Sequence, residues 1–272
     1  RRQGIEIMLG ADIIKKGAFT WNSKINWSRD RYTYDKIDPD YSTDKPWVKD
    51  GARWNWVAIN DWERDPSGNI IHYGGLPRAS KYQTVAGFNE ADFIWGWSNS
   101  FSYKQFSLNL SFDGRVGGVT HSVTDQAMWN SGSHPDSDNE YRYDMVVNGK
   151  NNYIGQGVKV VSGSVDYDSY GNITREDRVF AANDMPVSYE TYQVQMAPYI
   201  GSPRSQFMFS QTFVKLRDLS LVYQLPSTWS KKIKAKNTSV GLIGQNLWMW
   251  AKDFKYSDPD VGSDNLNSAS IR

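Results

Sequence analysis

The fold of this chain is decided by the stretch Phe213-Val-Lys-Leu-Arg-Asp-Leu-Ser-Leu-Val-Tyr-Gln-Leu-Pro226, with Gly244-Gln-Asn-Leu-Trp-Met-Trp250 further along the sequence. Side chains on a β-strand alternate between two faces, so the first stretch predicts a strand with one apolar and one polar face. Pro226 ends this strand because it has no N–H to donate to a sheet. The apolar face carries Leu219, Leu221, Tyr223 and Leu225, and the polar face carries Asp218, Ser220 and Gln224.

The same alternation returns in two earlier pairs of segments. Lys15-Lys16-Gly17 and Lys104-Gln105 supply their short polar turns, and the lysine-rich segment 227–236 joins the last pair. Alternation broken by short polar turns predicts antiparallel hairpins, and hence an all-β fold. The predicted strand pairs are residues 5–13 with 19–27, 93–103 with 106–112, and 219–225 with 240–249.

Long polar stretches separate these hairpins, at about residues 35–91, 114–153 and 161–209. A compact domain rarely contains a structureless connection longer than roughly 12 to 15 residues, so we expect strands or large surface structures inside them. We expect no helix longer than a turn or two. Short turns at one end and long loops at the other are typical of an outer-membrane β-barrel.

Composition fits a folded β protein. The chain has 39% hydrophobic and 14% aromatic residues, a mean hydropathy of -0.64 and a net charge of +1. These values exclude a disordered chain and give no reason to expect nucleic acid as a partner. No run of about 18 apolar residues predicts a transmembrane helix, but membrane strands keep the mean hydropathy low and are not excluded. Without cysteine the chain has no disulfide and no thiolate metal site.

Aromatic residues gather at or near the ends of the predicted strands. Amphipathic rings occupy the two membrane interfaces of a barrel, although aromatics are also common in the strands of soluble β-sandwiches. The aromatic positions fit both a barrel and a sandwich. The rings belong to Trp21, Trp27, Trp95, Trp97, Tyr103, Tyr223, Trp248 and Trp250.

Three segments, in order, resemble the SusC-like (SusC/RagA) TonB-dependent transporters of the Bacteroidetes outer membrane. They are residues 4–7 with 19–29, residues 101–108 with 114–118, and the opening stretch with Gly244–Trp250. The resemblance implies that residues 1–272 are the C-terminal part of a transmembrane, antiparallel β-barrel of about 22 strands with long extracellular loops. It also implies that the plug domain and the closing strand lie outside this chain.

Such a transporter makes and breaks no covalent bond, so the resemblance implies a protein that is not an enzyme. Its implied function is active uptake of an oligosaccharide or peptide across the outer membrane. Its implied partners are a SusD-like surface lipoprotein acting as a lid, TonB acting through the missing plug, and outer-membrane lipid. Polar side chains facing the lumen would be Asn22, Asn26, Asn109 and Asp113.

The best candidate for ligand contact is the tryptophan-rich segment 47–64, inside a predicted extracellular loop at 44–75. Tryptophan faces stack on sugar rings, and Trp and Arg also form hot spots in protein interfaces. The candidate residues for binding the substrate or the lid are Trp54, Trp56, Trp62 and Arg64. The alternative is that these tryptophans only pack the loop against its neighbours.

Metal sites are weakly indicated. His72, His121 and His134 lack the spacing and cysteine neighbours of a zinc site, and we expect them to be solvated loop residues. Two acidic clusters offer oxygen ligands that could take calcium, but neither has the glycine of an EF-hand loop, and solvated acids are the favoured interpretation. The clusters are Asp136, Asp138 and Glu140, and Asp258, Asp260 and Asp264.

A soluble β-sandwich that binds carbohydrate or acts as an adhesin is the main alternative function. It explains the aromatics and polar loops but not the ordered resemblance. A barrel should need detergent, whereas a sandwich should be monomeric in buffer. A glycoside hydrolase would in addition need two carboxylates at a defined separation, which scattered loop acids do not indicate.

Overall fold

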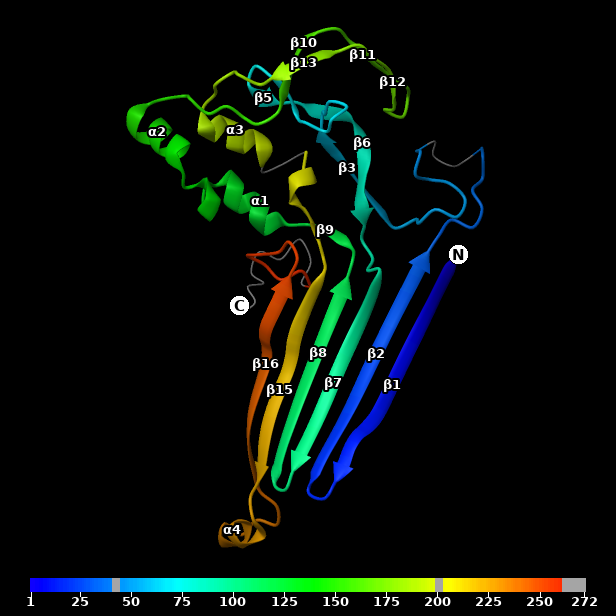
Figure 1. The fold of residues 1–272 in the computed structure, drawn as a ribbon, viewed down its shortest axis with the longest axis vertical. Coiled ribbons are helices and arrows are strands. Elements are labelled where there is room, and N and C mark those ends of the chain that lie inside the picture. Colours follow the sequence, from blue (N-terminus) through cyan, green and yellow to red (C-terminus); the bar gives the residue numbers. More distant parts are fainter. Residues whose placement is uncertain (41–44, 199–202, 261–272) are drawn as a thin grey trace.

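The computed structural model describes residues 1–40, 45–198 and 203–260. Its main element is a sheet of six long antiparallel strands in the order β1-β2-β7-β8-β15-β16 (Figure 1). These strands contain 11 to 15 residues each, about twice the usual strand length. Their bounds are β1 Arg2–Lys16, β2 Phe19–Tyr32, β7 Phe93–Tyr103, β8 Phe106–Val116, β15 Phe213–Gln224 and β16 Ser239–Ala251.

All three predicted strand pairs are confirmed. β1 pairs with β2, β7 with β8 and β15 with β16, each in antiparallel register. Gly17, with φ of 57°, makes the first turn, and Lys104 adopts φ of 52° in the second. As predicted, β15 ends at Gln224, and Pro226 precedes the short helix α4 (Ser227–Lys232) in the last connection.

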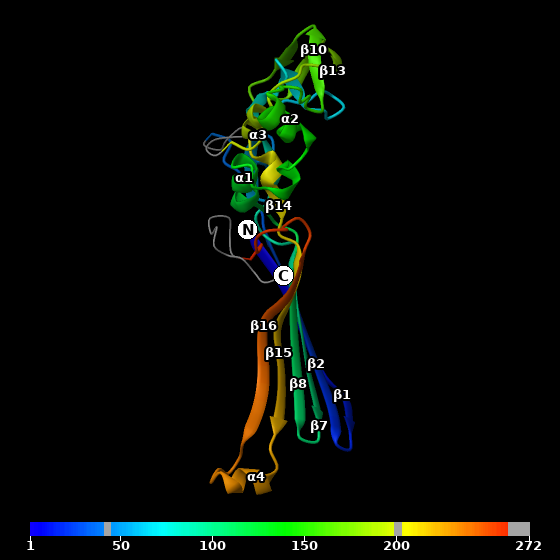
Figure 2. The same cartoon turned by 90° about the vertical axis from the view of Figure 1, so that its left-hand side faces the viewer.

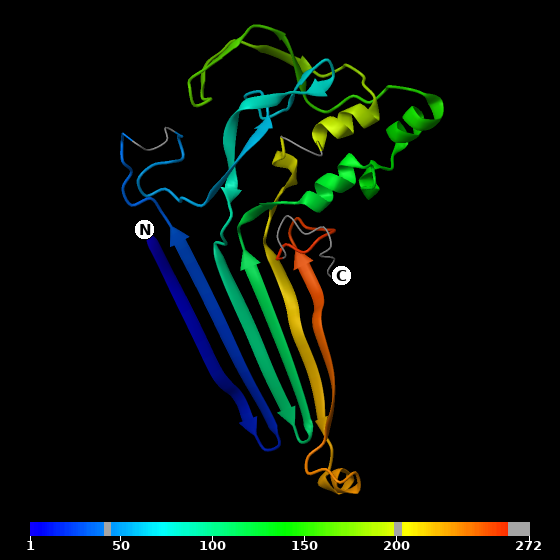
Figure 3. The ribbon, with the colours of Figure 1, turned by 180° about the vertical axis from the view of Figure 1, so that it is seen from behind.

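The connections are short at one end of the sheet and long at the other, as the sequence predicted (Figure 3). The described parts of the long insertions 33–92 and 117–212 fold together into an assembly beyond one end of the sheet (Figure 1), which we call the loop assembly. It contains β3 Trp56–Trp62, β4 Ile71–Tyr73, β5 Leu76–Pro77, β6 Ala79–Phe88, β9 Val119–His121, α1 Val123–Asn130, η1 Pro135–Ser137, α2 Glu140–Asn148, β10 Val158–Ser162, β11 Val165–Tyr167, β12 Ile173–Glu176, β13 Val179–Ala182, α3 Tyr189–Met196, η2 Ser205–Phe207 and β14 Met208–Ser210.

The helices of the loop assembly exceed the expectation of a turn or two. α1 and α3 have eight residues and α2 has nine, just over two turns each. Their sequences show no strong helical period. Side-chain caps help to fix where two of them begin, because Ser122 caps α1 and Asn139 caps α2. No described helix is long and apolar enough to cross a membrane.

The hydrophobic core lies in the loop assembly and at its junction with the sheet. Most of the fully buried apolar side chains come from there, whereas all of β1 and most of β16 are exposed. Seen edge-on, the long sheet has no second layer against either face among the described residues (Figure 2). This arrangement confirms an all-β antiparallel fold without a closed barrel, and it lacks the two packed sheets of the sandwich alternative. The buried apolar residues are Trp62, Ile71, Tyr189, Tyr192, Ala197, Phe207, Phe213 and Phe254.

Candidate functional site

The long sheet has one polar face, on which hydrogen bonds join neighbouring strands. Ser100 Oγ donates to Asn109 Oδ1 at 2.8 Å, and Asn109 Nδ2 donates to Ser220 Oγ at 3.1 Å. Asn22 is the cross-strand partner of Ser100, and its amide donates to Asp12 Oδ1 at 2.9 Å. Directly paired residues share a face. Asn26 and Asp113 each pair with Gly96, so all four residues predicted to face one side do share a face.

The opposite face is apolar and open. Paired rows across all six strands carry aliphatic and aromatic side chains, and many are strongly exposed, such as Leu9 at 66% and Leu242 at 73%. An apolar surface of this extent is unusual on a soluble monomer and indicates contact with something apolar. The exposed members of this face include Ile5, Ile7, Leu9, Ile14, Ile25, Trp97, Phe106, Leu221, Leu242, Trp248 and Trp250.

Two polar side chains interrupt the middle row of the apolar face, and both are covered by tryptophan. Trp21 Nε1 donates to Asn99 Oδ1 at 3.0 Å, and Trp97 Nε1 donates to Ser23 Oγ at 2.9 Å. Asn99 is only 3% exposed. An unpaired polar group in an apolar medium is costly, so these hydrogen bonds make the face compatible with such a medium.

Aromatic rings lie toward both ends of the apolar face. Trp21 stacks on Phe101 at 5.6 Å, and Phe106 lies 4.6 Å from Tyr223, near the short turns. Trp27 and Phe93, 5.9 Å apart, lie toward the loop assembly. The predicted position at strand ends therefore holds for most of these rings, but Trp27 and Trp97 lie inside β2 and β7.

Two β-bulges correct the simple alternation. In β1 the register shifts between Asp12 and Ile14, so Ile14 rather than Ile13 pairs with Trp21. In β15 the register with β8 shifts between Leu216 and Asp218 and leaves Arg217 as the extra residue. Arg217 then binds both carboxylate oxygens of Asp113, at 2.7 and 2.8 Å. A bulge redirects a side chain, and here it gives an arginine its carboxylate partner.

Ion pairs tie the segment after β16 to the polar face. Lys215 Nζ, on a side chain that is 2% exposed, lies 2.5 Å from Asp258 and 2.8 Å from Asp260, and Arg217 also contacts Asp260. Burial opposes ionisation of Asp260, but its hydrogen bonds with Lys215 and Arg217 lower its pKa overall. Lys215 and Arg217 thus pair with two acids for which solvation was the favoured expectation and calcium the alternative.

Calcium binding stays an untested prediction. Asp264, the third acid of that cluster, lies outside the described residues. Asp136 and Glu140 occupy the first turns of η1 and α2, and Asp138 follows η1. Within the part of the chain that the structure describes, no three acidic or histidine side chains come together in a metal-binding arrangement.

The expectation of solvated histidines is wrong for His72 and His134, which are 2% and 6% exposed. His72 stacks on Tyr192, and its Nε2 lies 3.1 Å from the tyrosine hydroxyl. His134 stacks on Trp129 at 4.3 Å. Burial lowers the pKa of His72 and raises that of Tyr192 to about 12, so both are neutral near pH 7. These histidines were misjudged because the loops fold into an assembly with its own core.

The four candidate binding residues differ in exposure and in the contacts they make. Trp62 is 2% exposed and donates from Nε1 to Gln206 Oε1 at 2.9 Å. Trp56 is half-buried, donates to the Tyr34 hydroxyl and meets Trp47 edge to face. Arg64 is exposed but bonds to Asp61. The position of Trp62 fits packing, the alternative considered above.

Trp54 is the exposed member of the four, at 52%. It lies 6.0 Å from Tyr32, ring to ring, and both line an open cavity of about 480 Å³ with Tyr34 and Arg2. An exposed aromatic beside polar and cationic groups is suited to contact a ligand or a partner protein. Residue 44, the first of the predicted loop 44–75, is outside the described residues.

A buried ionic cluster holds the two long insertions together. Arg178 NH1 lies 2.6 Å from Glu63, and its NH2 lies 2.5 Å from Glu176. Arg78 binds the other oxygen of Glu63 at 2.8 Å, and the Tyr167 hydroxyl donates to Glu63 at 3.2 Å. The hydrogen bonds with Glu176 raise the pKa of Arg178 against the effect of burial.

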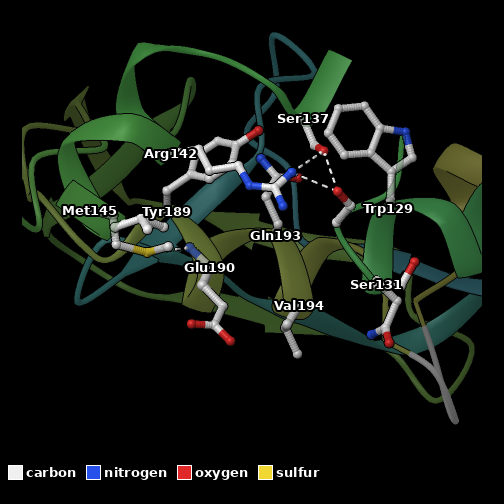
Figure 4. A pocket seen from close by; sticks show the side chains of 12 residues that line it. Trp129, Ser131, Ser137, Arg142, Met145, Tyr189, Glu190, Gln193 and Val194 are labelled. Carbon is white, nitrogen blue, oxygen red and sulfur yellow. Dashed lines mark hydrogen bonds between the residues drawn. The ribbon is translucent and has the colours of Figure 1, made fainter. Parts of the chain in front are cut away.

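Two cavities beside α3 were not predicted from the sequence. The first, of about 250 Å³, lies among α1, η1, α2 and α3 (Figure 4). At its wall Arg142 NH1 donates to the Gly132 carbonyl and to Ser137 Oγ at 2.6 and 3.0 Å. The second, of about 450 Å³, is lined by five aromatic side chains together with aliphatic and amide groups, and Trp129 and Gln193 border both. Apolar walls with a few polar groups are typical of ligand pockets.

Comparisons with known proteins concern the fold alone. No protein-family model matches the sequence, and no curated protein does. Solved structures match: a RagAB peptide transporter, with 15% identity and a TM-score of 0.53, and the RagAB peptide importer in "closed-closed" and "open-open" states, with 14% and 15% identity and TM-scores of 0.57 and 0.56. The alignments cover 96% of this chain and 27%, 27% and 26% of those chains. The chain thus spans about a quarter of the length of these structures and shares their fold over that part.

Proposed function

We propose that this chain forms part of the wall and extracellular loops of a TonB-dependent outer-membrane transporter that imports an oligosaccharide or a peptide. The observation that carries the proposal is the two-faced sheet, with an open apolar face, a hydrogen-bonded polar face, short turns at one end and an ordered loop assembly at the other. The likeness of the fold to RagAB peptide transporters supports the same class.

Dimensions support a sheet that spans a bilayer. A tilted membrane strand needs about 9 to 11 residues, and each of the six long strands has at least 11. Along β2, Trp27 lies six positions after Trp21, and at about 3.3 Å per residue the two lie about 20 Å apart. A barrel has an apolar outer band bordered by aromatic rings on this scale. The apolar face would then meet lipid and the polar face the lumen.

The outer edges of β1 and β16 would be continued by strands of the whole barrel. Neither edge pairs with another strand among the described residues, and β1 and β16 are 15 and 13 residues long. Long unpaired edges promote association with any available strand, and barrel closure removes them. We assign the full length, 1–272, to the barrel domain and place the plug, through which TonB would act, elsewhere in the protein.

The loop assembly would meet the substrate and a SusD-like lipoprotein lid. Trp54 and the cavities beside α3 offer aromatic surface with polar groups, which suits sugars and peptides alike. The neutral His72–Tyr192 pair is explained by packing and hydrogen bonding inside the loop assembly, without a catalytic role. We therefore propose transport without covalent chemistry, and no role for nucleic acid.

Uptake by cells tests this function. Cells that carry the full-length gene should accumulate a labelled oligopeptide or oligosaccharide, and dissipating the proton-motive force should abolish the accumulation. Cells with the gene deleted are the control. Uptake that persists without the proton-motive force would contradict the TonB-dependent mechanism, and a detergent-free, monomeric full-length protein would contradict membrane insertion.

The apolar face can be tested with two neighbouring residues. Leu219 lies in the middle row of the apolar face, paired with Leu110, whereas Ser220 pairs with Asn109 on the polar face. Leu219→Arg should destabilise the inserted protein by roughly 2 to 4 kcal/mol because it places a charge near the bilayer midplane. Ser220→Arg should cost much less. Urea titration of the protein folded in vesicles measures both, and the reverse order would mean that the lipid and lumen faces are exchanged.

A further inference from the structure

The turn end of the sheet carries charge of one sign only. The segments that form it, 13–21, 102–108 and 222–243, contain no Asp or Glu. The three connections at this end lie in a row opposite the loop assembly (Figure 1). Every lysine on them is exposed. These residues are Lys15, Lys16, Lys104, Lys231, Lys232, Lys234 and Lys236.

Nothing in the described chain neutralises these lysines. The lysines that form ion pairs there are Lys150, Lys159 and Lys215, all in or next to the loop assembly. The loop assembly itself mixes acids with bases, so the two ends of the molecule differ in charge. Like charges gathered without counter-charges repel, and an anionic partner would relieve that repulsion.

Exposed apolar groups accompany the lysines. Trp229 on α4 is 59% exposed, and Ile233, directly after α4, is 63% exposed. The ring pair of Phe106 and Tyr223 lies at the turn ends of β8 and β15, and the Lys104 ammonium lies 5.3 Å from the ring of Tyr103. Tryptophan and lysine together at the edge of an apolar band are typical of a membrane interface.

We propose that this basic end binds the headgroups of anionic phospholipids in the leaflet reached by the short turns, while Trp229 and Ile233 insert among the first acyl carbons. The inference rests on the membrane insertion proposed above. Lysines near an anionic membrane surface each strengthen binding, and long stems let the ammonium reach the phosphates. Three connections anchored in one plane would fix the depth of the sheet in the bilayer.

Lipid selectivity tests this inference on the full-length transporter. The protein is reconstituted in phosphatidylcholine vesicles, and electron spin resonance measures the association constants of spin-labelled phosphatidylglycerol and phosphatidylcholine at the protein surface. At low salt we expect a preference for phosphatidylglycerol of about threefold or more. Raising the ionic strength to about 1 M should remove most of it, because the Debye length falls to about 3 Å.

Matched variants locate the effect. The variant with Lys231, Lys232, Lys234 and Lys236 changed to Gln should lose at least half of the preference. The control changes four exposed lysines at the other end, Lys49, Lys81, Lys252 and Lys255, to Gln and should retain it. Equal association of both lipids, or equal loss in both variants, refutes this inference alone. A protein that restricts no lipid at all refutes membrane insertion and the inference with it.

Discussion

Replacing Arg178 with methionine should loosen the loop assembly by about 3 kcal/mol of local unfolding free energy. The Arg178 side chain is 2% exposed, and it links Glu63 in the first long insertion to Glu176 in the second. Removing one partner of a buried ion pair typically costs 3 to 5 kcal/mol because the other charge stays buried. We expect the low end of that range, since Arg78 and Tyr167 would still bind Glu63.

Hydrogen exchange measures this change in the full-length protein. Backbone amides of β4, β10 and β13 should exchange about a hundredfold faster in Arg178→Met, while amides of the long sheet should be unaffected. Arg175→Met is the control, because Arg175 makes ion pairs with Asp166 and Asp177 but is half exposed. Solvent-exposed ion pairs contribute little to stability. Equal acceleration in both variants would contradict the structural role of the buried cluster.

A second substitution distinguishes the loss of the arginine contacts from the cost of leaving the Glu63 charge buried without its partner. Glu63→Gln in the Arg178→Met background removes the buried charge that the first change leaves behind. Part of the lost protection should then return, because a neutral amide costs less to bury than a carboxylate. If the double variant loses more local unfolding free energy than the two single variants lose together, Glu63 is held mainly by Arg78.

Local alternation predicted the long sheet well, because each strand's faces are encoded by residues two apart. The hairpins also follow from short turns whose ends are neighbours in the sequence. The bulges escaped prediction for the opposite reason. The bulge at Arg217 lets this residue bind Asp113, which is 104 residues away in the sequence. No local pattern marks which residue of a strand will form a bulge.

The loop assembly was predicted only in outline. Length alone indicated internal structure in the long polar stretches. Its core is made by pairs far apart in the chain, such as His72 with Tyr192, 120 residues apart, and Trp62 with Gln206, 144 residues apart. A tryptophan in a polar loop therefore gives no sequence signal that distinguishes a packing residue from a binding residue.

The structure makes that distinction testable at Trp62. Trp62→Ala should destabilise the loop assembly by roughly 3 to 5 kcal/mol, the usual cost of emptying a buried tryptophan site. It would also leave Gln206 Oε1 without the donor that now binds it at 2.9 Å. Hydrogen exchange of β3 and β6 should show the loss, and any fall in ligand uptake would follow from it. A Trp62→Ala protein with normal exchange would contradict the packing role.

Trp54 should respond in the opposite way, since about half of its side chain is exposed and its ring lies 6.0 Å from that of Tyr32 at the edge of an open cavity. Trp54→Ala should change the local unfolding free energy of the loop assembly, measured by hydrogen exchange, by no more than about 0.5 kcal/mol. If Trp54 contacts the substrate or the lipoprotein lid, affinity should fall about fivefold or more, equivalent to about 1 kcal/mol. Co-purification of the lipoprotein and uptake of labelled ligand measure the two contacts separately. Undiminished docking and uptake with normal surface expression would remove Trp54 from the binding surface and leave the cavities beside α3 as the place to look.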